Sequence, residues 1–194
     1  MVGNLLRLYE QVPQDVRENG RMWYHDVRNQ CEVWAKEFDT SIEQVAGVIS
    51  SFSPRTSWTK DLSLSRQLLV CHKGGNWQDA FLLPTLKRAV RDAWMILDGN
   101  LSTLKGPKTT AFMDNIANLE SEKATVDVWA MRAAEFNLDA PYKDITGNYG
   151  EYESAYLEGG WLTGLRGYEF QAIIWVWVRY VAHTRNQLTQ LTLF

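Results

Sequence analysis

Residues 104–132 read LKGPKTTAFMDNIANLESEKATVDVWAMR, and this stretch decides the fold class. A tight element at residues 104–108 leads into a segment whose apolar residues recur at helical spacing, which predicts a helix. Asp127 stands immediately before a second such segment, residues 128–136, where its side chain can cap the helix by accepting hydrogen bonds from the first amides. The stretch therefore indicates an all-α fold.

The same helical spacing extends over most of the chain, and no segment alternates convincingly as a strand. Thr40 and Glu43 have the spacing of a capping box, and Pro54 ends the helix that they open. We predict one helical domain over residues 1–194, with further helices at about 21–38, 40–53, 57–73, 84–97, 149–157 and 167–184, the last two separated by Gly159-Gly160 and Gly164. Val33 and Leu86 lie on or near the apolar faces. Trp175 lies in an apolar stripe and is assigned to the core, and the predicted core also includes Val48, Ile49, Leu68, Trp94, Phe112 and Ile173.

Composition narrows the class of protein. Of the 194 residues, 45% are hydrophobic and 22% are charged, as expected of a folded chain. The longest apolar run, residues 172–178, is too short to span a bilayer, and residues 1–10 have no signal-peptide pattern. We expect a cytoplasmic protein that does not enter a membrane. Two cysteines and three scattered histidines provide neither a four-cysteine iron–sulfur site nor a zinc site, so no metal or other cofactor is expected.

Charge is distributed unevenly along the chain. The net charge is −3, but residues 52–112 carry nine basic and four acidic side chains, a net charge of +5. A locally basic region can hold a phosphate backbone even in an acidic protein. Ordinary solvated helix faces explain the same pattern, and charge alone favours that explanation.

The motifs in residues 104–132 resemble the helix-hairpin-helix DNA glycosylases of the endonuclease III type. These proteins carry an L-P-G-V-G-x-K-T-A hairpin followed by V-D-x-x-x-x-R. Here Leu104, Gly106, Lys108 and Thr109 match the first motif, whereas Val126, Asp127 and Arg132 match the second. Upstream, residues 45–55 resemble the apolar helix that ends in L-S-x-Q, so the resemblance covers about residues 41–135.

The resemblance implies a helical bundle with a helix-hairpin-helix element that acts on bases in DNA. Lys108, or Lys105 in its place, would supply an amine that attacks the sugar and forms a Schiff base. Asp127 would stabilise the positive charge that builds on the sugar, with both groups facing one cleft. A first-turn surface lysine and an N-cap aspartate are the alternatives.

The resemblance also implies contacts with DNA. Arg55 replaces the family's glutamine, which fills the gap left by an extruded base; a role at the end of its helix is the alternative. Gly106 would contact a phosphate, although this hairpin is shorter and Pro107 has no N–H to donate. If DNA is the partner, the basic charge of residues 52–112 predicts that Lys60 and Lys105 hold further phosphates. Trp129, with Tyr142 or Tyr149, could stack on an extruded base.

The chain is also similar to small phage and plasmid proteins of no assigned function. The shared motifs are S-P-R-x-x-W, G-P-K, V-D-x-W and Q-A-x-x-W, here residues 53–58, 106–108, 126–129 and 171–175. A phage-encoded protein would act in the host cytoplasm. Two other functions stay open: a transferase that hypermodifies DNA bases on a glycosylase-like fold, and a non-catalytic helical DNA-binding protein. The sequence leaves the oligomeric state open.

Overall fold

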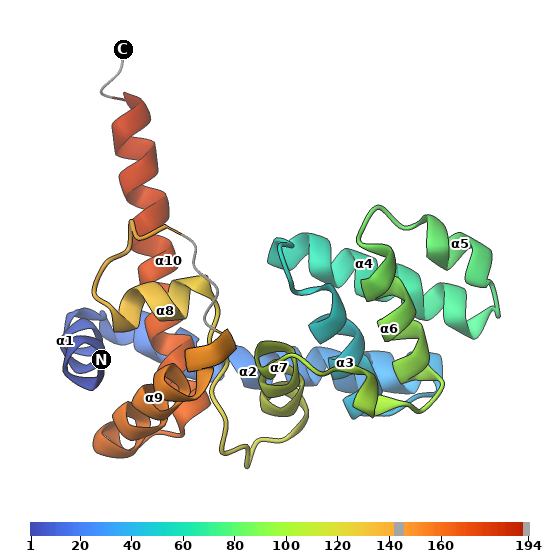
Figure 1. Cartoon of the computed structure of the whole chain (residues 1–194), viewed down its shortest axis with the longest axis horizontal. Coiled ribbons are helices and arrows are strands. Elements are labelled where there is room, and N and C mark those ends of the chain that lie inside the picture. The colour runs from blue at the N-terminus through green and yellow to red at the C-terminus, as the bar shows by residue number, and fades with distance from the viewer. Residues whose placement is uncertain (142–145, 192–194) are drawn as a thin grey trace. The chain divides into compact units, whose positions relative to one another are not determined.

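A computed structural model describes residues 1–141 and 146–191, and within these ranges the regular structure is entirely helical (Figure 1). The all-α class predicted from the sequence is confirmed. Two short 3-10 helices, η1 (Leu101–Thr103) and η2 (Thr146–Asn148), accompany the α-helices. The α-helices are α1 (Val2–Gln11), α2 (Gln14–Phe38), α3 (Ile42–Phe52), α4 (Trp58–Lys73), α5 (Trp77–Leu82), α6 (Lys87–Leu97), α7 (Pro107–Ala117), α8 (Val128–Ala134), α9 (Tyr149–Thr163) and α10 (Gly167–Leu191).

The chain forms two compact units. One consists of residues His25–Leu119 and is called the contiguous unit; the other combines Met1–Tyr24 with Glu120–Phe194 and is called the split unit. Helix α2 passes from the split unit into the contiguous unit between Tyr24 and His25. The single domain over residues 1–194 stays a prediction. The stretch that resembles glycosylases, about residues 41–135, is divided between them.

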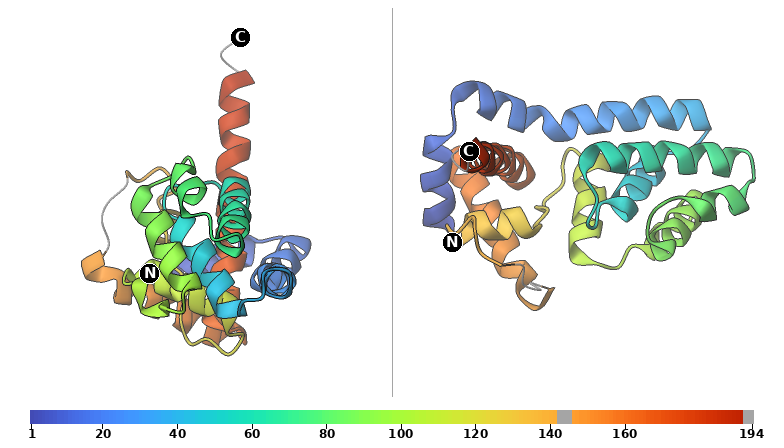
Figure 2. Two further views of the ribbon diagram at one scale, coloured as in Figure 1. Left: turned by 90° about the vertical axis from the view of Figure 1, so that its right-hand side faces the viewer. Right: turned by 90° about the horizontal axis from the view of Figure 1, so that it is seen from above.

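Helix α3 forms the centre of the contiguous unit. Every residue from Val45 to Phe52 is buried, because α4, α6 and α7 all pack against this helix (Figure 2). Close packing with α6 requires the absence of a side chain at Gly47, where a Cβ atom would lie 2.8 Å from Cγ2 of Ile96. Val48, Ile49, Leu68 and Phe112 lie in this core as predicted.

Helix α10 has the corresponding place in the split unit, where it packs against α1, α8 and α9. Ile173 is buried as predicted, and a Cβ atom on Gly20 would lie 2.6 Å from its Cα atom. The expected break at Gly159-Gly160 is wrong, because both glycines lie inside α9. Their small size is used in packing instead: a Cβ atom on Gly159 would lie 2.4 Å from the ring of Phe170. Gly164, with φ of 71°, ends α9.

Several local predictions are also wrong. The capping box of α3 uses Ser41 and Gln44 rather than Thr40 and Glu43, with the Ser41 hydroxyl accepting from the Gln44 amide at 3.1 Å. Trp94 is only half-buried and packs edge-on against Trp77 of α5, a helix that was not predicted. Val33 is exposed because the buried face of α2 is centred on other residues, and Leu86 is exposed as the N-cap of α6, outside the helix.

No helix within residues 1–141 and 146–191 is long and apolar enough to cross a membrane.

Candidate functional site

Two of the shared motifs meet in the contiguous unit. The Lys108 amine, from the G-P-K motif, donates to the Ser53 hydroxyl of the S-P-R motif at 3.4 Å. The same hydroxyl donates to the backbone carbonyl of Ser50 at 3.0 Å. Residues 55 positions apart in the sequence are therefore brought together at the end of α3 and the start of α7. We call Ser53, Asp61, Ser65 and Lys108 the lysine site.

The start of α7 positions Lys108. Gly106 is the N-cap and Pro107 is the first helical residue, which suits proline because that position needs no amide donor. The Thr110 hydroxyl donates to the Gly106 carbonyl at 3.0 Å and secures the first turn. Lys108 is half-buried, whereas Gly106 and Lys105 are exposed.

Asp61 of α4 is a buried acid that the sequence did not reveal as a site residue. Its side chain is 2% exposed, and one carboxyl oxygen lies 3.3 Å from the Ser65 hydroxyl. Burial raises the pKa of Asp61 from 3.8 to about 7, although the Ser65 hydrogen bond and the positive charge of Lys108 both act to lower it. Asp61 and Ser65 are four residues apart, one helical turn, on the face that also carries Leu64 and Leu68.

The predicted phosphate-binding residues of the contiguous unit lie at its surface. Arg55, Lys60 and Lys105 are all exposed. Arg55 occupies the turn between α3 and α4 with φ of 60°, a left-handed conformation that is uncommon for a residue with a side chain. The structure thus leaves these three cations accessible to a ligand.

The other two shared motifs meet in the split unit. One carboxylate oxygen of Asp127 accepts hydrogen bonds from the amides of Trp129 and Ala130, each at 2.9 Å. The other oxygen accepts from the indole Nε1 of Trp175, on α10, also at 2.9 Å. The predicted N-cap is confirmed, and the V-D-x-W and Q-A-x-x-W motifs are joined through this carboxylate.

Helix α9 holds the segment that leads to Asp127. The Tyr149 hydroxyl donates to the Ala124 carbonyl at 2.9 Å and accepts from the Val126 amide at 3.0 Å. A Glu153 carboxylate oxygen accepts from the Ala124 amide at 3.1 Å. Tyr149 is therefore buried and committed to the backbone, which excludes the stacking role predicted for it. Tyr142 lies outside the described residues.

Trp129 is half-buried, and two guanidinium groups lie near its ring. Arg132, also on α8, and Arg179, on α10, both approach its ring. Arg132 further donates to the Ala140 carbonyl at 2.7 Å. Sequence reasoning identified Trp129 as a binding residue but assigned Trp175 to the core, and it gave Arg179 no role.

Lys108 lies in the contiguous unit, whereas Asp127 lies in the split unit. The cleft that the two side chains are expected to share stays a prediction. The sites assembled within each unit are the lysine site and the surroundings of Asp127.

The cysteines, the possible metal ligands and the cavity of the contiguous unit give less support for a functional site than the lysine site does. Burial raises the pKa of Cys31 to about 12 and also raises that of Cys71, which disfavours a reactive thiolate at both. The described residues contain no group of three or more His, Cys, Asp or Glu side chains that could hold a metal ion. A cavity of about 570 Å³ in the contiguous unit is lined by Arg66, Cys71 and Asp79 among others, and not by Lys108.

The fold and these sites define an all-α protein that carries a buried acid near a lysine in one unit and a capped carboxylate beside tryptophan and arginine in the other. The chain belongs to a family of unknown function (DUF7178), whose family model matches residues 1–182. No curated protein and no solved structure matches the chain. Both sites lie within the residues that the family model spans.

Proposed function

We propose that the protein processes bases in DNA as an N-glycosylase with Schiff-base lyase activity, in which the Lys108 amine is the nucleophile. One observation carries the proposal: the amine lies 3.4 Å from the Ser53 hydroxyl and within electrostatic range of the buried Asp61 carboxyl group. A lysine nucleophile must first lose a proton, and a carboxylate that titrates near neutral pH is suited to accept it.

The reaction proceeds through the unprotonated form of the Lys108 amine. Lys108 transfers a proton to Asp61, and its nitrogen attacks C1′ of the sugar. The C1′–N bond breaks, and the base leaves with the electron pair and takes up a proton. The C1′–O4′ bond then breaks, with the proton held by Asp61 passing to O4′, which leaves a protonated Schiff base between Lys108 and C1′. Loss of the C2′ proton to water forms the C2′–C3′ double bond, breaks the C3′–O bond and releases the 3′ phosphate. Stabilisation of the developing sugar cation by Asp127 stays a prediction.

The local fold around Lys108 supports this assignment. Residues 98–106 join α6 to α7, and this short connection between two helices is compatible with the helix-hairpin-helix element inferred from the sequence. Lys108 lies in the first turn of α7, where the helix dipole disfavours the charged ammonium form. The connection supports the hairpin element, and the position at the helix N-terminus favours an amine that is available for attack.

The charge of residues 52–112, which lie in the contiguous unit, supports DNA as the partner. Arg55, Lys60 and Lys105 are exposed in the same unit as Lys108. Because the pKa of Asp61 is raised to about 7, this acid contributes less than a full negative charge near neutral pH. The basic character is therefore stronger than residue counting indicates. A protein that acts on DNA in a bacterial host would work in the cytoplasm, as expected from the sequence.

Trapping with borohydride tests the proposal, because it reduces a Schiff base to a stable amine. We expect a covalent adduct between the parent protein and duplexes that carry abasic sites or members of a panel of modified bases. Lys108→Gln should abolish the adduct and retain the parent's melting temperature. Lys105→Gln, at an exposed position three residues away, is the matched control and should retain the adduct at protein concentrations that saturate the DNA. An adduct that survives Lys108→Gln would overturn the assignment.

One observation favours a second candidate function, DNA binding without chemistry. All three N–H donors on Asp127 belong to the protein itself, so its carboxylate has a complete structural role as a helix cap and as an acceptor for Trp175. DNA binding with neither base release nor a trapped adduct, over the whole panel of modified bases, would favour this candidate.

A further inference from the structure

Four planar side chains of the split unit alternate between cation and aromatic ring. The Arg132 guanidinium lies 4.9 Å from the centroid of the Trp129 ring. The Arg179 guanidinium lies 5.7 Å from that ring and 4.9 Å from the ring of Trp175. We call these four residues the tryptophan–arginine cluster.

Helical spacing builds the cluster from two short patterns. Trp129 and Arg132 are three residues apart on α8, and Trp175 and Arg179 are four apart on α10, so each pair shares a helix face. The Trp175 ring is fixed at its edge by the hydrogen bond to Asp127, and it also packs against Trp23, with the ring centroids 5.9 Å apart. The cluster is therefore a positioned surface and not a chance meeting of mobile side chains.

The four residues differ in how firmly they are held. Trp129 and Trp175 are half-buried, and Arg132 donates to the Ala140 carbonyl at 2.7 Å. Arg179 is exposed on α10. It is the member that can leave its place with the least cost, because a long exposed side chain changes rotamer easily.

We propose that Trp129 and Trp175 stack the base of an unpaired nucleotide and that Arg179 and Arg132 hold its phosphates. Tryptophan faces and guanidinium planes both stack on nucleobases, and arginine binds phosphate through two parallel hydrogen bonds. In the free protein Arg179 covers the rings; in the complex a base takes that place and the guanidinium moves to the phosphate. This inference rests on the proposed function, which identifies the ligand as DNA. It adds that the split unit binds an unpaired nucleotide of that DNA.

The test uses a single-stranded oligonucleotide containing 2-aminopurine, whose fluorescence is quenched when the base stacks. Lys108→Gln serves as the background protein, so that no chemistry at Lys108 contributes. We expect saturable quenching on binding. In this background, Trp129→Leu should weaken binding by at least about fivefold and reduce the quenching at saturation, since each stacked base contributes roughly that much or more.

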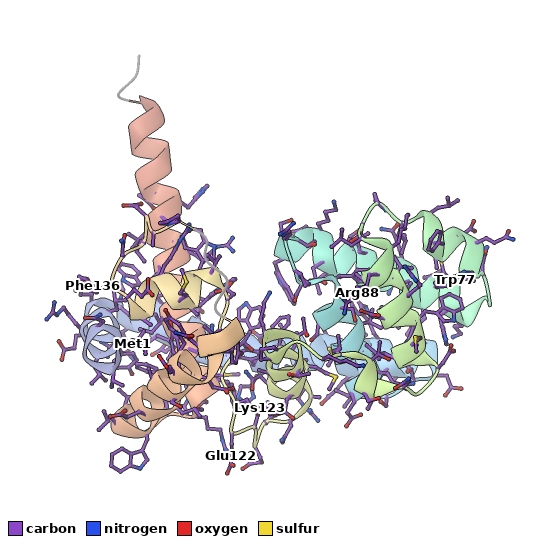
Figure 3. The ribbon with its side chains drawn as sticks, viewed as in Figure 1. Met1, Trp77, Arg88, Glu122, Lys123 and Phe136 are labelled. Carbon is purple, nitrogen blue, oxygen red and sulfur yellow. The ribbon has the colours of Figure 1, made fainter. Side chains whose placement is uncertain are left out.

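Matched variants separate the cluster from general effects. Trp161→Leu, at a residue 76% exposed on α9, removes a tryptophan from the same unit and should leave binding and quenching unchanged. Arg179→Met removes the guanidinium and should weaken binding. Arg7→Met is the matched control: it removes a guanidinium that lies 5.4 Å from the centroid of the Phe136 ring, and it should not weaken binding. Phe136 is labelled in Figure 3. Arg179→Lys keeps the charge and should recover only part of the affinity. Thermal melts show whether each variant is folded.

Two results would overturn the inference. One is no quenching by the background protein. The other is that folded Trp129→Leu and Arg179→Met variants both bind the oligonucleotide as tightly as the background protein does. Its failure is distinguishable from failure of the proposed function. Quenching by the background protein, with no adduct trapped by the parent, would reject the lyase and keep the cluster as a nucleotide site. A trapped adduct with no cluster dependence would reject the cluster alone.

Discussion

The indole Nε1 of Trp175 donates to a carboxylate oxygen of Asp127 at 2.9 Å, which ties α10 to the residue that caps α8. The other oxygen of Asp127 is occupied by the amides of Trp129 and Ala130. A single carboxylate thus completes a helix cap and joins two helices. Replacing it affects both functions, and they can be separated by experiment.

Asp127→Asn should lower the free energy of unfolding by about 1–3 kcal/mol. Asparagine can keep the cap through its oxygen, but its NH2 group then faces the N–H of Trp175, and two donors cannot pair. Trp175→Phe removes the second donor, so the double variant should lose less stability than the two single losses added together. Denaturant unfolding of the four proteins measures this coupling. Additive losses would show that the hydrogen bond does not persist in solution.

Asp61 should make the protein less stable as the pH rises from about 4 to about 7. Burial raises its pKa from 3.8 to about 7, so in this range the folded state keeps a proton that the unfolded state has released. The free energy of unfolding should fall by up to about 1.4 kcal/mol per pH unit from this group. Asp61→Asn should flatten the dependence, whereas Asp26→Asn, at an exposed position on α2, should not. Equal slopes in the parent and Asp61→Asn would contradict the burial of an ionisable Asp61.

Arg55 should be replaceable by glycine with a gain in stability and a loss in DNA binding. Its φ of 60° costs a residue with a side chain about 1 kcal/mol, which glycine avoids. Arg55→Gly should therefore raise the free energy of unfolding by up to about 1 kcal/mol. Arg55→Ala, the control, keeps the strained conformation and should not gain stability, yet both variants should bind DNA equally weakly. If both variants bind DNA as tightly as the parent protein, Arg55 does not contribute to DNA binding, and this prediction is wrong.

The salt dependence of DNA binding should report Lys60 and Lys105. If each contacts one phosphate, Lys60→Gln and Lys105→Gln should each reduce the slope of log K against log salt concentration by about one. Arg88 of α6, whose side chain is 83% exposed and lies near Asp92, provides the control, and Arg88→Gln should leave the slope unchanged (Figure 3). Titrations at several salt concentrations measure the slopes. Slopes that match the parent in both lysine variants would show that these cations are merely solvated.

Sequence reasoning succeeded where short-range interactions decide the outcome. The cap at Asp127 depends on amides two and three residues away, and it was predicted. The burial of Asp61 depends on how the face of α4 meets other helices, which local spacing does not reveal for a charged residue. Trp175 was placed in the core because it lies in an apolar stripe, but the same stripe brings its N–H to a carboxylate 48 residues earlier.

The prediction for Trp94 failed for a related reason. The residue has the helical spacing of a core position, but α5 and His72 cover only part of its ring, so the side chain is half-buried. Periodicity predicts which face of a helix is apolar and says little about how completely neighbouring elements cover it. The contacts that remained hidden are those between elements far apart in the sequence.

The division of the split unit into two segments sets an order of assembly during translation. The Asn4 side chain donates to the Ala134 carbonyl at 3.0 Å, so α1 must wait until the ribosome has added 130 further residues, which takes on the order of ten seconds. All residues of the contiguous unit are synthesised during that interval. A ribosome that stalls before α8 leaves Leu5 and Leu8 without the helices that bury them. The hydrogen bond between Trp175 and Asp127 forms only after this part of α10 has been synthesised.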